Sequence, residues 1–147
     1  MTGGDAVRPA RWEPITAVAG LLGLATLTFL AASVIHFGVR LPLGVVTIYD
    51  PFSGAALPEA IIAAVLAGGL VTVVTKARAA WWVALTATVF GVLGVIVGVS
   101  VILGRQLGRS GDLVYHATML VELLLTLGVL LTPQTRRALG QFGSRNR

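Results

Sequence analysis

The sequence predicts an all-α membrane protein, a bundle of four transmembrane helices with a long first extracytoplasmic loop. Of the 147 residues, 56% are hydrophobic and only 12% are charged, whereas soluble domains carry roughly 25% charged residues. Four apolar stretches are each long enough to cross a hydrocarbon core of about 30 Å as a helix. The expected spans are residues 15–36, 58–75, 80–103 and 113–132, within a single domain 15–132; an arm of residues 1–14, an outer loop of residues 37–57 and a basic tail of residues 133–147 complete the chain.

The first span follows a polar arm that contains Trp12 and Pro14. Tryptophan is enriched at membrane interfaces, and proline suits the first turn of a helix. Arg8 and Arg11 ahead of an apolar run also fit a secretory signal peptide, but the run is longer than the roughly 7 to 15 residues of a signal core. We therefore expect this segment to stay in the protein as a membrane-spanning helix.

The outer loop interrupts the apolar pattern with glycine, proline and charged residues. Its β-branched part, residues 43–51, fits a short strand, a turn on the membrane surface or a shallow re-entrant segment. A surface loop folded over the helix ends is the preferred interpretation, because backbone groups at bilayer depth need hydrogen-bond partners that a four-helix chain can hardly supply.

The second and third spans carry helix-start and helix-packing signals. Pro58 and Glu59 fit the first turn of the second span, where the helix dipole favours an acidic residue. Trp81 and Trp82 suit an interface at the start of the third span. Glycines then recur along one face of that span, which permits close helix approach. These packing residues are Gly91, Gly94 and Gly98.

The fourth span carries a carboxylate near its middle. Glu122 lies about 14 Å along the helix axis from the start of the span, where an acidic residue costs about 2.5 to 3.5 kcal/mol on insertion scales. Such a residue is expected to face the protein interior. Tyr115 and Thr118 share its helix face, whereas His116 points roughly 120° away. Pro133 ends the span, and the tail beyond it is expected to be mobile.

The distribution of basic residues predicts the orientation. With four spans both termini lie on one side, which collects eight of the basic residues and leaves three opposite. The first group is Arg8, Arg11, Lys76, Arg78, Arg136, Arg137, Arg145 and Arg147, and the second is Arg40, Arg105 and Arg109. The positive-inside rule then places both termini in the cytoplasm. Since these charges form no single patch, nucleic acid is not an expected partner. The alanine-, glycine- and arginine-rich usage indicates the cytoplasmic membrane of a bacterium.

This topology predicts an outward-facing polar cleft. His36, Glu59 and His116 fall near the outer boundary and Glu122 lies deeper, with Tyr115 and Thr118 beside it. The expected function is non-enzymatic: a small accessory or binding subunit whose cleft holds a ligand, an ion or a partner of a larger membrane complex. Association with itself or with other membrane subunits through the glycine face of the third span fits this function.

Other functions stay open on sequence alone. A small proton- or cation-coupled transporter would use Glu122 as the titrating group. A membrane enzyme, or a haem- or quinone-binding protein, is a third interpretation, with His36 and His116 as the pair for a haem iron. A divalent metal on His36, His116 and Glu59 is a weak prediction, because these residues come from three helices without a short spacing motif. No thiolate site exists, since the chain has no cysteine.

Overall fold

The computed structural model describes residues 13–105 and 110–140. The elements in chain order are α1 (Glu13–His36), β1 (Leu41–Leu43), β2 (Val46–Ile48), α2 (Ser53–Val74), α3 (Ala80–Arg105), α4 (Ser110–Leu131) and α5 (Pro133–Gly140). Apart from one short hairpin these elements are helical, and four of them are long and apolar enough to cross a membrane, as predicted. The predictions that concern Trp12 and the arginines at positions 8, 11, 109, 145 and 147 lie outside the described residues.

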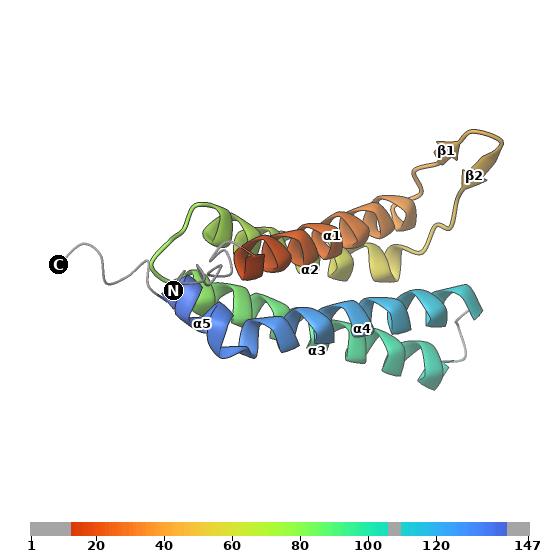
Figure 1. Ribbon diagram of the computed structural model, residues 1–147. Coiled ribbons are helices and arrows are strands. Elements are labelled where there is room, and N and C mark those ends of the chain that lie inside the picture. The colour runs from red at the N-terminus through yellow and green to blue at the C-terminus, as the bar shows by residue number, and fades with distance from the viewer. Residues whose placement is uncertain (1–12, 106–109, 141–147) are drawn as a thin grey trace, which may run out of the picture.

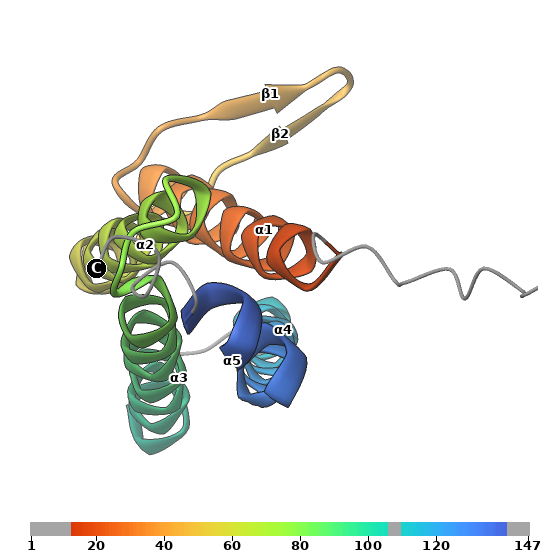
Figure 2. The same ribbon diagram turned by 60° about the vertical axis from the view of Figure 1, so that its left-hand side comes forward.

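The four long helices form a ring in which each packs against two others. α1 contacts α2, α2 contacts α3, α3 contacts α4, and α4 returns to α1 (Figures 1 and 2). Buried side chains on α1 recur at helical spacing, for example Val18, Leu22, Ala25 and Phe29. Large apolar side chains also cover the outside, among them Leu27, Val97 and Leu125. Helices that are apolar all round are typical of membrane spans.

Glycines permit the close approach of α3 to its neighbours. A Cβ added at Gly94 would lie 2.6 Å from the Ile62 side chain on α2, and one at Gly91 would lie 3.2 Å from Leu123 on α4. At Gly98 the nearest atom would be Nε2 of His116, at 2.8 Å. The glycine face of α3 is therefore covered by α2 and α4 of the same chain. Any association with another subunit would have to use a different face.

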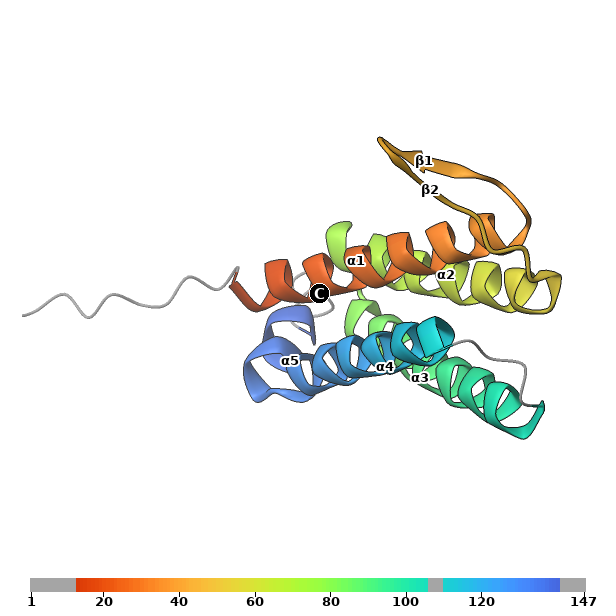
Figure 3. The same ribbon diagram turned by 90° about the vertical axis from the view of Figure 1, so that its right-hand side faces the viewer.

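The connection between α1 and α2 differs from the expected loop. α2 begins at Ser53, five residues earlier than predicted, and Pro58 stands inside the helix rather than in its first turn. β1 and β2 pair in an antiparallel hairpin. Its two-residue turn has Gly44 at a φ of +62° in the first central position, which favours glycine. The strand interpretation was therefore the right one for this segment, but the hairpin extends to the side of α1 instead of folding over the helix ends (Figures 2 and 3).

The start of the C-terminal tail is a helix, which corrects the prediction of a mobile segment. Pro133 occupies the first position of α5, where its missing N–H costs nothing. The backbone N–H of Thr135 donates to the Thr132 hydroxyl at 3.3 Å, as in a helix N-cap. Thr135 and Leu139 are buried against the bundle. The proline thus ends one helix and begins the next.

α5 closes one end of the bundle, called here the α5 end, which also holds the α2–α3 connection (Figure 1). The Trp81 indole N–H donates to the Leu130 carbonyl at 2.9 Å. This carbonyl lies in the last turn of α4, where no helical N–H reaches it because the chain bends before Pro133. The Arg136 guanidinium lies 5.2 Å from the centroid of the Trp81 ring. The first contact joins α3 to α4, and the second holds α5 against α3. The opposite end, where α1 leads into the hairpin, is called the hairpin end.

Candidate functional site

A buried pair of His36 and Glu59 joins α1 to α2 at the hairpin end. Nδ1 of His36 lies 2.7 Å from Oε2 of Glu59, and the two side chains are only 12% and 5% exposed. The contact is a salt bridge when the imidazole carries two protons and the carboxylate none, and a hydrogen bond without an ion pair when the imidazole carries one. Because α2 starts at Ser53, Glu59 stands in the second helical turn rather than at the dipole end. A carboxylate this deeply buried needs such a partner.

Tyr115 of α4 brings a third helix to the pair. Its ring makes an edge contact with Phe29 of α1, with centroids 6.3 Å apart. Its hydroxyl lies within interaction range of the Glu59 carboxylate. Within the described part of the chain, both this hydroxyl and Oε1 of Glu59 are buried without a hydrogen-bond partner. His36, Glu59 and Tyr115 are called here the buried polar cluster.

The cluster is covered rather than open. Ser33, also buried, donates from its hydroxyl to the Ala56 carbonyl at 2.7 Å. The Phe52 ring makes an edge contact with His36 at 6.2 Å, and its backbone N–H donates to the His36 carbonyl at 3.0 Å. These contacts close α1 and α2 around Glu59. The outward-open cleft expected from the sequence is therefore replaced by an enclosed site at the same end of the bundle.

His116 does not join this cluster. Its Nδ1 lies 2.7 Å from the backbone carbonyl of Asp112. A carbonyl can only accept, so Nδ1 carries a hydrogen and donates it. The other ring nitrogen packs against the backbone of α3 at Gly98. The helical wheel predicted this divergence from Glu122, and the imidazole is directed to α3 because only glycine leaves room for it there.

The predicted metal and haem ligands are not assembled. In residues 13–105 and 110–140, no three His, Asp or Glu side chains are grouped so that they could hold a metal ion. His36 engages Glu59, whereas His116 engages Asp112 and the α3 backbone. The two imidazoles therefore have different neighbours, and this arrangement gives no support to a shared haem iron.

Glu122 lies deeper than the cluster. It stands seven residues after Tyr115 on the same face of α4, which is about 10 Å along the axis. It is half-buried, and its Oε1 has no hydrogen-bond partner among the described residues. Tyr115 is within electrostatic range of both Glu122 and Glu59. Thr118, in contrast, is exposed and donates to the Val114 carbonyl at 2.8 Å, so it lines neither position.

Sequence reasoning grouped His36 and Glu59 by depth but did not pair them. A signal for the pair was available, since the two residues lie at adjoining ends of consecutive antiparallel spans. Asp112 was missed as a neighbour: it lies within electrostatic range of Glu59. Its place at the start of α4, on the same end of the bundle, was the available signal.

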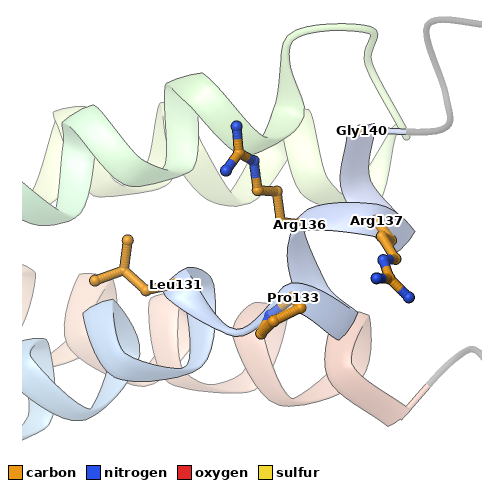
Figure 4. A pocket seen from close by; sticks show the side chains of 5 residues that line it. All are labelled: Leu131, Pro133, Arg136, Arg137 and Gly140. Atoms are coloured by element: carbon orange, nitrogen blue, oxygen red, sulfur yellow. The ribbon is translucent and has the colours of Figure 1, made fainter.

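A groove of about 500 Å³ opens at the α5 end. It is lined by Leu131, Pro133, Arg136, Arg137 and Gly140 (Figure 4). The two arginine side chains extend in different directions from α5 (Figure 4). The groove therefore contains none of the candidate site residues and lies at the opposite end from the buried polar cluster.

No protein-family model matches the chain, and no curated protein or solved structure matches it either.

Proposed function

We propose that this chain is a small integral membrane subunit, without enzymatic activity, that binds a small cation, the proton included, at the buried polar cluster. One observation carries the proposal. Oε1 of Glu59 and the Tyr115 hydroxyl are both buried, interact with each other and make no hydrogen bond to any other group in the described residues. Leaving a buried polar group unsatisfied costs about 1 to 3 kcal/mol, so a bound species that satisfies both oxygens stabilises the fold.

The chemistry and size of the cluster limit the ligand. Carboxylate and hydroxyl oxygens can bind a proton, form hydrogen bonds with water and coordinate hard cations. With Glu59 only 5% exposed and enclosed by contacts between α1 and α2, the site favours a small ion over an organic molecule. His36 on the other carboxylate oxygen holds Glu59 in place and can share its proton.

The membrane location belongs to the same proposal. Four long apolar helices with exposed apolar side chains support a multi-pass protein. The excess of basic residues at the α5 end supports cytoplasmic termini, and the composition supports a bacterial cytoplasmic membrane. In this orientation the buried polar cluster lies near the outer boundary. The apolar outer surfaces of α3 and α4 are free to meet lipid or other subunits of a larger complex.

Replacing Glu59 with glutamine is expected to abolish ion binding while the protein still folds. The measurement is difference infrared spectroscopy of the purified protein in lipid, on exchange between buffers that differ in pH or in sodium concentration. Bands of a buried carboxyl group should change in the unaltered protein and be missing in Glu59→Gln, because this substitution keeps the shape and removes the ionisable oxygen.

Glu122→Gln is the matched control, as it changes the same chemistry two helical turns deeper. It should keep the bands, and circular dichroism should show equal helix content in all three proteins. Bands that persist in Glu59→Gln, or that are missing from the unaltered protein, would contradict the proposal.

A proton- or cation-coupled transporter is the second candidate, favoured by one observation. Tyr115 lies within range of both carboxylates, so polar groups extend from the hairpin end toward the middle of the bundle. If the chain transports, Glu122→Gln should stop pH-driven uptake into reconstituted vesicles, because the deeper carboxylate would carry the coupled proton. Uptake that is unchanged in this variant would remove Glu122 from the mechanism.

A further inference from the structure

The hairpin between α1 and α2 has one fully apolar face. The strand register sets Leu41 opposite Ile48 and Leu43 opposite Val46. Successive side chains of a strand point to opposite faces, so these four side chains share one face. Leu43 and Val46 are 62% and 58% exposed. Ile48 is exposed as well, whereas Leu41 at the base of the hairpin is half-buried, so the described chain leaves most of this face uncovered.

The other face of the hairpin is different in kind. Pro42 stands opposite Thr47 on it. Two residues further along the ribbon, and therefore on the same face, the Arg40 guanidinium lies 4.8 Å from the centroid of the Tyr49 ring. A cation and an aromatic ring with a polar tip therefore mark this face, and the hairpin is amphipathic.

The hairpin lies across the bundle rather than along it. Figure 2 is the view whose line of sight runs closest to the helix axes. In it the hairpin is seen at nearly its full length and extends sideways past α1. Only four residues separate α1 from β1, and four separate β2 from α2. Each linker spans at most about 14 Å, so the hairpin stays level with the ends of the two helices. Phe37 and Phe52, on these linkers, are both exposed.

We propose that the hairpin is an interfacial membrane anchor, with the face of Leu41, Leu43, Val46 and Ile48 turned to the acyl chains and Arg40 and Tyr49 in the headgroup layer. The inference rests on the proposed membrane location. The partner of the apolar face is the lipid surface, because the hairpin continues directly from two apolar helices and runs crosswise at their ends. Both features align its apolar face with a membrane boundary.

Backbone hydrogen bonding limits how deeply the hairpin can enter the membrane. A two-stranded ribbon has two unpaired edges, which cannot be satisfied in the hydrocarbon core but can be satisfied by water and headgroups. An isolated hairpin is also marginally stable in water, so burial of its apolar face in the interface stabilises it. The geometry thus matches a shallow position at the level of the acyl-chain boundary.

The test uses the absence of native cysteine. Single variants Val46→Cys and Thr47→Cys place a nitroxide label on the apolar and the polar face at neighbouring positions, and Leu124→Cys places one on the exposed outside of α4. The full chain is reconstituted in nanodiscs that contain anionic phospholipid. Electron paramagnetic resonance then compares collision with oxygen, which concentrates in lipid, and with a water-soluble nickel chelate.

The expected result is oxygen-dominated relaxation at position 46 and nickel-dominated relaxation at position 47. The ratio of oxygen to nickel accessibility should be at least threefold higher at position 46 than at position 47. Nickel access at both hairpin positions, with oxygen access at 124, overturns the anchor and leaves the membrane location intact. A label at 46 that is shielded from both reagents means a protein contact with a second copy and also overturns it. Nickel access at position 124 overturns the membrane location itself.

Discussion

Replacing His36 with alanine is expected to lower the free energy of unfolding by about 2 to 3 kcal/mol. The substitution leaves the Glu59 carboxylate buried without its partner at 2.7 Å. The value lies toward the low end for a broken buried pair because the imidazole is 12% exposed, so water can replace part of the contact. Unfolding in mixed detergent micelles, followed by circular dichroism, measures the change.

A double-mutant cycle separates the pair from general packing. In a Glu59→Gln background, His36→Ala is expected to cost only about 1 kcal/mol, since a neutral amide is less costly to leave unpaired than a carboxylate. Thr118→Ala removes an exposed hydroxyl of α4 and should have almost no effect. Equal costs of His36→Ala in both backgrounds would show that the two side chains are not coupled.

Gly98→Ala is expected to destabilise the bundle by about 1 to 3 kcal/mol. The new methyl group would lie 2.8 Å from Nε2 of His116. The imidazole cannot easily move aside, because its other nitrogen is hydrogen-bonded to the Asp112 carbonyl. The ring or the whole α3–α4 contact must therefore shift. The same unfolding measurement gives the change in free energy.

Gly128→Ala is the matched control for this substitution. Gly128 lies within α4, and a Cβ there would have no neighbour within 4 Å. Since alanine is the better helix former, this variant should be neutral or more stable by up to about 1 kcal/mol. If both alanine variants behave alike, Gly98 does not hold the position of His116.

The four long helices could be predicted from the sequence because long, uninterrupted apolar stretches are typical of membrane-spanning helices. Helix ends were harder to predict, and the two largest errors involve proline. Pro58 fits a helix start on sequence alone, but α2 begins at Ser53 and accommodates the ring in its second turn. Pro133 fits the end of helical structure, although Thr132 ahead of it is an N-cap residue and a helix follows.

His36, Glu59 and Tyr115 are among the candidate residues that the sequence indicates, but their contacts could not be predicted, and His116, Thr118 and Glu122 do not lie in the cluster. Depth along a helix can be counted from the sequence, and it correctly put His36 near Glu59. Rotation about the helix axis depends on which neighbours pack, so no sequence pattern indicates that Glu59 is buried more deeply than Glu122. In the structure Glu59 is buried and paired with His36. Glu122 is half-buried and lies about two helical turns from Tyr115 on α4.

The tie between α1 and α2 has a consequence for biogenesis. These helices are consecutive in the chain, and every polar contact that shields Glu59 on the α1 side comes from residues made before it. In the membrane location proposed above, the first two helices can enter the bilayer together as a helical hairpin, with the carboxylate already bonded to His36 when it leaves the insertion machinery. The acidic residue then never meets lipid alone, and the second helix pair can join later to complete the ring.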